Sequence, residues 1–269
     1  MSKIKTQAQP AINTNKEEVI SHFDERLKST LDEGRKELIA KRHQRGYRSA
    51  RENLNHLCDK DSFLEYGQLA VAAQRRRRDI DDLKKHTAAD GIITGLATIN
   101  AALFDEQASR AVVIVNDYTV LAGTQGVFHH KKLDRALELA AELKLPVVMY
   151  AEGGGGRPGD TDYELSLNLG SFAAWAGLRS QVPMIAVNNG YCFAGNAALF
   201  GCADITIATK SSWIGMAGPA MIEGGGMGNY KPTDIGPIET QAQNGVVDIV
   251  AEDEADATRI ARQVLSYFQ

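Results

Sequence analysis

The segment from residue 182 to residue 210 (VPMIAVNNGYCFAGNAALFGCADITIATK) constrains the fold of this chain more than any other. An apolar run at 182–187 and a β-branched run at 205–208 predict two buried strands. Residues 188–190 (NNG) are expected to end the first strand, and the small residues at 194–199 predict a short helix. The segment is therefore expected to form a strand, a glycine turn, a helix and a second strand.

The start of this predicted helix is a candidate site for a developing oxyanion. The first N–H groups of a helix have no partner inside the helix, and they point outward with the positive end of its dipole. Ala194, Gly195 and Asn196 are therefore candidate backbone donors. An equally weighted interpretation is a tight strand-to-helix turn that holds no ligand.

Apolar runs alternate with helical patterns over most of the chain. Residues 92–99 predict a strand, and residues 101–104 are expected to return as its hairpin partner. Further strands are predicted at 111–115, 146–150 and 204–208, and further helices at 128–143, 163–178 and 254–267. Strands that alternate with helices imply crossover connections, so a largely parallel sheet with right-handed crossovers is expected.

The first sixty residues predict helices that precede the sheet. Residues 1–16 are polar and are expected to form a disordered tail, which leaves 17–269 as one domain. Residues 17–45 predict helix with a break near Gly34. Ser49 and Glu52 have the S-x-x-E spacing of a capping box, so a second helix is expected to start there.

Composition and charge exclude several classes of partner. The net charge of −4 gives no reason to expect nucleic acid, and no apolar run reaches the length of a membrane span. Cys58, Cys192 and Cys202 lack C-x-x-C spacing, so they are interpreted as buried thiols in a reducing, cytoplasmic setting, and no metal site is expected. The run at 75–78 (RRRR) is interpreted as a solvated segment, with a phosphate-binding or acidic-partner surface as the alternative.

A second glycine-rich segment, residues 152–159 (EGGGGRPG), follows a predicted strand. Gly154, Gly156 and Gly159 satisfy G-x-G-x-x-G, but Pro158 delays the helix that a dinucleotide site requires inside the glycines. The acidic residue that would bind a ribose is also missing at the end of the next strand. The preferred interpretation is a nest of backbone N–H groups for an anion, and a flexible surface loop is the alternative.

The stretch NNGYCFAGNAALFGCADITIAT resembles the signature of the crotonase (enoyl-CoA hydratase) superfamily. NDYTVLAGTQGVFHHKKLDRALELA, EGGGGRPGD and IGMAGPAMIEGGGMGNYKP resemble the carboxyltransferase component of biotin-dependent acyl-CoA carboxylases of the propionyl-CoA and methylcrotonyl-CoA type. The resemblance runs from about Glu17 to the end, and it covers the first of the two such domains that those components usually carry. It implies an α/β fold of the crotonase-like (ClpP/crotonase) class, a spiral of ββα units with N-terminal helices.

The resemblance also implies where the oxyanion donors lie. Gly154, Gly155 and Gly156 fall on the small residues of a family segment S-G-G-A-R, whose amides face the reacting oxygens. Ala194 and Gly195 fall on the turn that supplies the second donor.

The candidate substrate-binding residues are Arg48, Arg51, Arg157, Phe193 and Met216. Arg48 and Arg51 are expected at the coenzyme A phosphates, with salt bridges on a helix surface as the alternative. Arg157 falls on the arginine of S-G-G-A-R. Phe193 and Met216 are candidates for the wall of an acyl pocket, with simple core packing as the alternative.

The implied function is acyl-CoA carboxyl transfer, in which CO₂ passes from carboxybiotin to the α-carbon of an acyl-CoA. Biotin is expected on a partner carrier protein, and coenzyme A as part of the substrate. The implied partners are a C-terminal-type carboxyltransferase half, a biotin carboxyl carrier protein and a biotin carboxylase, in a homo- or hetero-oligomer. One alternative is another crotonase-like enzyme, a hydratase or decarboxylase with Glu223 as its acid–base group. The other is a non-catalytic CoA-binding subunit of a carboxylase.

Overall fold

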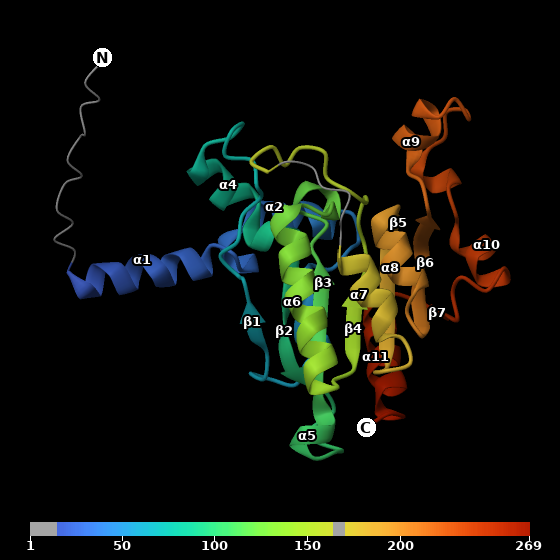
Figure 1. The fold of residues 1–269 in the computed structure, drawn as a ribbon, viewed down its shortest axis with the longest axis horizontal. Helices are drawn as coiled ribbons and strands as arrows, with labels where there is room; N and C mark the ends of the chain where they lie inside the picture. Colours follow the sequence, from blue (N-terminus) through green and yellow to red (C-terminus); the bar gives the residue numbers. More distant parts are fainter. Residues whose placement is uncertain (1–14, 164–169) are drawn as a thin grey trace.

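The computed structural model describes residues 15–163 and 170–269 of the chain, which form one seven-stranded sheet flanked by helices (Figure 1). The strands are β1 (Leu64–Tyr66), β2 (Ile92–Thr98), β3 (Arg110–Asn116), β4 (Val147–Tyr150), β5 (Met184–Phe193), β6 (Ile205–Gly215) and β7 (Ile249–Ala251). The helices are α1 (Lys16–Lys28), α2 (Lys36–Gln44), α3 (Ala50–Leu57), α4 (Ile80–His86), α5 (Glu106–Ser109), α6 (Val127–Leu143), α7 (Gly170–Leu178), α8 (Gly195–Gly201), α9 (Pro219–Gly224), α10 (Ile238–Gln243) and α11 (Glu254–Ser266).

The strands lie in the sheet in the order in which they occur along the chain. β1, β2 and β3 pair antiparallel, and every pairing from β3 to β7 is parallel. The prediction of a largely parallel sheet with helical crossovers is therefore confirmed. The hairpin predicted at 101–104 is wrong, because β3 itself pairs antiparallel with β2 and the chain between them turns through Asn100 and α5.

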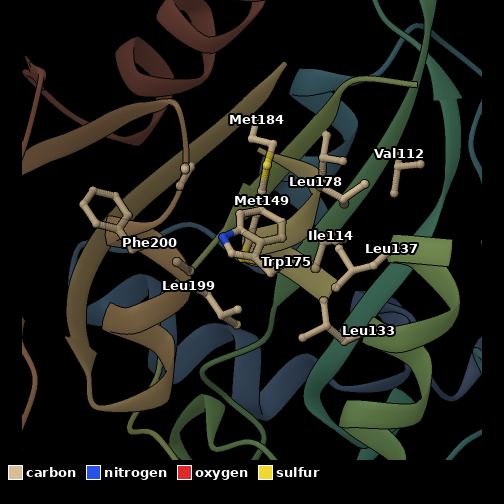
Figure 2. Packing of buried hydrophobic residues seen from close by; sticks show 14 of the residues in the cluster. Val112, Ile114, Leu133, Leu137, Met149, Trp175, Leu178, Met184, Leu199 and Phe200 are labelled. Atoms are coloured by element: carbon tan, nitrogen blue, oxygen red, sulfur yellow. The ribbon is translucent and has the colours of Figure 1, made fainter. Parts of the chain in front are cut away.

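Alternate residues of the buried strands face two separate apolar layers, as strands covered on both faces require. One layer lies under α6, α7 and α8, and Figure 2 shows Trp175, Met149 and Ile114 packed together at its centre. The other layer lies under α3 and α11 and includes Val113, Val148 and Ile185. The sheet is thus the middle of three layers, and its strand ends are held rigidly on both sides.

The N-terminal helices begin where the sequence predicts. α1 ends before a 3₁₀ turn at Asp32–Gly34, which confirms the expected break. The capping box is also present: Ser49 Oγ accepts from the Glu52 N–H at 2.9 Å, and Glu52 Oε2 accepts from the Ser49 N–H at 2.7 Å. The tail predicted at 1–16 falls mostly on residues 1–14, outside the described residues, and α1 already begins at Lys16.

β5 does not end at residues 188–190 as expected. The strand continues to Phe193, with a register shift between Asn188 and Gly190 against β6. Gly190 has a φ of +90°, which a residue with a side chain rarely adopts, and its carbonyl accepts from the Asn188 amide at 3.0 Å. A glycine that looked like a strand end therefore marks a bulge, and the strand carries the chain directly into α8.

Within the two described ranges, no helix is long and apolar enough to cross a membrane.

The core of the α6 layer offers a stability test on a single helix. Leu133 is 0% exposed and Leu143 is 43% exposed. Leu133→Ala leaves a cavity and should lower the free energy of unfolding by about 2–5 kcal/mol. Leu143→Ala makes the same chemical change near the surface and should alter it by only about 0.5 kcal/mol. Denaturant unfolding of both variants measures the difference, and equal losses would contradict the layer assignment.

Candidate functional site

Three backbone segments meet at the carboxyl ends of β3, β4 and β5. They are the loop before α6 (117–126), the glycine loop after β4 (151–160) and the turn before α8 (193–195). Gln125 pairs with Gly156 in one parallel bridge, and Gly153 pairs with Cys192 in another. Ligands of open α/β sheets bind beyond the carboxyl ends of the strands, so this meeting point is the candidate site.

The Asn196 side chain holds the three segments together. Its Oδ1 accepts from the Gly155 N–H at 2.9 Å, and its Nδ2 donates to the Ala151 carbonyl at 3.1 Å and the Gly123 carbonyl at 3.5 Å. Asn196 is fully buried. A Cβ at Gly153 would lie 2.2 Å from Asn196 Nδ2, so the Asn196 side chain can pack this closely only against a glycine. The sequence analysis considered only the backbone of Asn196, whereas its side chain shapes the site.

Three of the five backbone donors that the resemblance implies already have acceptors inside the fold. The N–H groups of Gly154, Gly155 and Ala194 donate to Ala122 O, Asn196 Oδ1 and Gly215 O, at 3.0, 2.9 and 3.0 Å. These three amides are therefore bonded within the fold, and the oxyanion role expected for them stays a prediction that these bonds do not favour. The sequence could not reveal this, because each acceptor comes from a distant segment.

The two remaining candidates, Gly156 and Gly195, keep their N–H groups without an acceptor among the described residues. A Cβ placed at Gly155 would lie 3.5 Å from the Gly195 nitrogen, so the glycine loop and the start of α8 are in contact. Gly155 has a φ of +85°, which turns the loop into this contact. Gly156 borders open space, since a Cβ there would meet nothing within 4 Å.

Arg157 does not face the open space. Its guanidinium is buried and forms an ion pair with Asp90, and it donates to the Thr124 carbonyl at 2.6 Å. Asp160 lies 3.5 Å away. In the structure this side chain anchors the glycine loop to the body of the domain, and the substrate-binding role expected for Arg157 stays a prediction that this burial does not favour.

Arg48 and Arg51 are also bonded within the fold. Arg51 is buried and forms an ion pair with Glu65 at 2.9 Å. The Arg48 guanidinium contacts His56 Nδ1 and the Glu52 carbonyl, each at 3.0 Å. Arg51 thus fits the salt-bridge alternative, whereas Arg48 is hydrogen-bonded to residues of α3, and the phosphate role of both stays a prediction.

Phe193 and Met216 lie at the end of the β5–β6 pair but in different surroundings. Phe193 is 6% exposed and its ring stacks on Tyr191 with centroids 5.7 Å apart. Met216 is 67% exposed. Phe193 therefore packs beneath the segment after β6, whereas Met216 stands on the surface, and the acyl-pocket role of both stays a prediction.

A cavity of about 490 Å³ opens beside the glycine loop, and α2 forms one wall. Its lining residues are Leu38, Lys41, Arg42, Arg45, Tyr47, Tyr118, Thr119, Ala122, Glu152 and Tyr191. Lys41 lies on α2 and Arg45 directly follows the last residue of this helix, and both are exposed. The sequence analysis missed these cations, although their i, i+4 spacing places them on one helix face.

No group of three or more His, Cys, Asp or Glu side chains in the described ranges is arranged to hold a metal. The neighbouring residues His129 and His130 form hydrogen bonds within the fold. His129 Nε2 lies 2.8 Å from Asn116 Oδ1, and His130 Nδ1 lies 3.0 Å from Ser171 Oγ.

Comparison with known proteins decides the family. The model of the carboxyl transferase domain matches residues 41–269. This chain belongs to the carboxyl transferase domain family.

The relatives of this carboxyl transferase domain agree with its fold. It is 30% identical over 232 residues to the methylmalonyl-CoA carboxyltransferase 12S subunit of Propionibacterium freudenreichii subsp. shermanii, covering 85% of this chain and 42% of the relative. It is 28% identical over 264 residues to the biotin-dependent long chain acyl-coenzyme A carboxylase beta4 subunit of Mycobacterium tuberculosis. This match covers 97% of this chain and 47% of the relative. The chain thus spans less than half the length of these relatives.

Solved structures confirm the crotonase-like α/β class. A single-chain, multi-domain long-chain acyl-CoA carboxylase superposes with a TM-score of 0.91 and 55% identity, over 96% of this chain and 25% of that one. The transcarboxylase 12S hexamer, with methylmalonyl-coenzyme A and methylmalonic acid bound, superposes with a TM-score of 0.76 and is 26% identical in sequence. The superposition covers 95% of this chain and 48% of the transcarboxylase chain.

In this carboxyl transferase domain a buried ion pair joins α2 to the glycine loop. Arg42 donates to both carboxylate oxygens of Glu152, at 3.0 and 2.6 Å, and Glu254 lies 3.9 Å from the same guanidinium. The guanidinium also lies over the ring of Tyr47, 4.8 Å from its centroid. Burial raises the pKa of Glu152 to about 7, against the attraction of Arg42. The pair fixes the cavity wall relative to the loop, 110 residues apart in sequence.

The raised pKa of Glu152 predicts how stability depends on pH. Its folded pKa of about 7 exceeds the ordinary 4.5, so folding favours the neutral carboxyl. The stability that Glu152 contributes is fully present below pH 4.5 and is lost as the pH rises through 7. Relative to Glu152→Gln, the wild-type free energy of unfolding should therefore fall across this window.

Urea unfolding of both proteins from pH 4 to 8 measures this difference. Glu142→Gln, on the exposed part of α6, controls for loss of a carboxyl as such. A constant difference between wild type and Glu152→Gln would show that the carboxyl does not titrate in this window.

Proposed function

We propose that this chain is the acyl-CoA-binding half of a biotin-dependent acyl-CoA carboxyltransferase. The observation that carries the proposal is the pair of amides at Gly156 and Gly195, which lack acceptors among the described residues and lie in contacting segments. Glu152 of the same glycine loop lines the cavity. Family membership supports it, since the relatives are named for carboxyl transfer to or from acyl-CoA thioesters. The chain spans less than half of those relatives, so the activity belongs to a larger assembly.

The cavity suits the nucleotide part of coenzyme A. Lys41 and Arg45 would attract its phosphates, because exposed cations on one helix face act together on an anion. The rings of Tyr47, Tyr118 and Tyr191 line the same cavity and offer flat apolar surfaces to a purine. In this proposal α2 takes the phosphate role that the sequence analysis assigned to Arg48 and Arg51.

The thioester would lie with its carbonyl oxygen toward the amides of Gly156 and Gly195. Removal of the α-proton shifts negative charge onto that oxygen as the enolate develops, and fixed N–H donors stabilise it without reorganisation. The resulting carbon nucleophile would then bond to the carboxyl carbon as the bond between that carbon and the biotin nitrogen breaks, and the α-proton would pass to the biotin. Biotin, on a partner carrier, would supply the carboxyl group and the base for this reaction.

The segment after β6 is the face that we assign to the partner half. Met216, Met221, Met227 and Tyr230 are all exposed there, next to the site. A contiguous exposed apolar surface on a stable domain is typical of an interface. A C-terminal-type half, a carrier and a biotin carboxylase complete the proposed assembly.

The alternative enzyme class has less support. A hydratase or decarboxylase of this fold needs a carboxyl at the reacting carbon, and the candidate Glu223 is exposed on α9, 3.5 Å from the Asn229 amide. Glu152 lies within the glycine loop, but both of its carboxylate oxygens accept from Arg42. A non-catalytic subunit would also bind coenzyme A, so only the presence or absence of catalytic turnover distinguishes it from the proposed enzyme.

We further propose a cytoplasmic location, which the three free cysteines support. Burial raises the pKa of the Cys58 thiol to about 12, so it is unreactive. Cys192 is also buried, but Cys202 is exposed, which corrects the expectation that all three are buried.

Calorimetric titration of the chain with acetyl-CoA, propionyl-CoA and free coenzyme A tests the proposal. Saturable binding is expected. The double variant Lys41→Ala/Arg45→Ala should bind all three ligands about tenfold or more weakly at low salt. Lys85→Ala with Arg259→Ala removes the same charge away from the cavity and should have little effect. Failure of the folded wild-type chain to bind any of these ligands would refute the acyl-CoA site.

Gly156 allows one backbone donor to be removed with a matched control. Gly156→Ala keeps the N–H and adds a Cβ into open space, whereas Gly156→Pro removes the N–H. In the assembled enzyme, the proline variant should lose about 100-fold in the rate of carboxyl transfer, and the alanine variant should stay near wild type. Matching thermal melts would exclude a folding effect, and normal turnover by a folded proline variant would exclude Gly156 as a donor.

A further inference from the structure

Gln125 is one of nine residues in the described ranges whose side chain has a buried nitrogen or oxygen atom without a hydrogen-bond partner. It lies in the loop before α6 and is 4% exposed. Its Nε2 has no hydrogen-bond partner among residues 15–163 and 170–269. A buried amide without a partner costs about 1–3 kcal/mol, so a folded protein rarely retains one without a functional reason.

The backbone of Gln125 directs its side chain toward the site. Its N–H donates to the Gly155 carbonyl at 2.7 Å, and its carbonyl accepts from the Arg157 N–H at 2.9 Å. This is a parallel bridge with Gly156, and bridged residues project to the same face. Gln125 therefore shares the face on which Gly156 borders open space.

The end of the side chain reaches the second open donor. A Cβ at Gly195 would lie 2.5 Å from Gln125 Oε1 and 3.3 Å from its Cδ, so the amide packs directly on Gly195. The N–H groups of Gly156 and Gly195 and the Nε2 of Gln125 thus gather without an acceptor from the described residues. Three donors with no acceptor suit a ligand that carries exposed oxygens.

Gln74 shows what a structural glutamine looks like in this chain. It is 6% exposed, and its Nε2 donates to Asp160 Oδ1 at 3.1 Å. Gln74 and Gln125 are equally buried but only Gln74 has its donor satisfied, so burial alone does not explain Gln125.

We propose that Gln125 is a substrate-contacting residue whose side-chain amide donates to an oxygen at the reacting end of the acyl-CoA. This oxygen is either the thioester carbonyl or a carboxylate oxygen of the carboxylated thioester. The inference rests on the proposed function and goes beyond it, because it adds a side-chain donor to the backbone amides. It also implies that the amide discriminates acyl-CoA from free coenzyme A, which lacks both oxygens.

The test compares Gln125→Met with Gln74→Met in the whole chain. Methionine keeps the length of the side chain and removes the donor. Calorimetry with free coenzyme A, propionyl-CoA and methylmalonyl-CoA measures three binding affinities. Free coenzyme A reports binding of the nucleotide part alone, propionyl-CoA adds the thioester carbonyl oxygen, and methylmalonyl-CoA adds the carboxylate oxygens as well. Thermal melts of both variants report whether the amide serves the fold.

Gln125→Met should bind free coenzyme A as wild type does, and should bind one or both thioesters about tenfold more weakly. A loss for both thioesters identifies the carbonyl oxygen, and a loss for methylmalonyl-CoA alone identifies the carboxylate. Its melting temperature should be unchanged or raised, because an unpaired buried amide is removed. Gln74→Met should melt at a lower temperature and show no selective loss for the thioesters.

Two results would overturn the assignment of Gln125. One is unchanged binding of both thioesters by Gln125→Met, and the other is a fall in melting temperature as large as that of Gln74→Met. Gln125→Leu repeats the test should the methionine variant fail to fold. A wild-type chain that binds no thioester would instead refute the proposed function, and the Gln125 assignment with it.

Discussion

The arrangement of the site depends on one buried side chain. Asn196 bonds to the backbone of Gly155, Ala151 and Gly123, which belong to two loops on neighbouring strands. A loop of four consecutive glycines has many accessible conformations, and selecting one of them costs backbone entropy. The Asn196 amide stabilises the one conformation in which the Gly156 and Gly195 amides remain without internal acceptors.

Buried charges extend this constraint to the rest of the molecule. Arg157 ties the far end of the glycine loop to Asp90, and Arg42 ties its near end to α2 through Glu152. Ion pairs away from water gain little net stability, because desolvation opposes the attraction. Their geometry is nevertheless specific, so they define where each end of the loop lies. The cavity and the glycine loop thus form one connected structure.

The same region contains several features that oppose stability. Ala194 has a φ of +51° and Asp90 a φ of +52°, values that residues with a side chain rarely adopt. Gln125 Nε2 is buried without a partner. Strain and unpaired donors of this kind persist only where the surroundings over-determine the structure, and they gather at functional sites. The three-layer core around the sheet provides those surroundings.

The sequence by itself determined the strand and helix pattern, the Ser49 capping box and the family motifs, because these depend on local spacing and on recognisable residue types. It pointed to two loops that the structure brings into contact, but it could not tell which of their amides have acceptors inside the fold. The partner of an N–H group is set by segments distant in the chain: Gly154 bonds to Ala122, and Ala194 bonds to Gly215. The tertiary structure alone therefore decided which donors remain open, that Arg157 and Arg51 are internal, and that Gln125 lies among the donors.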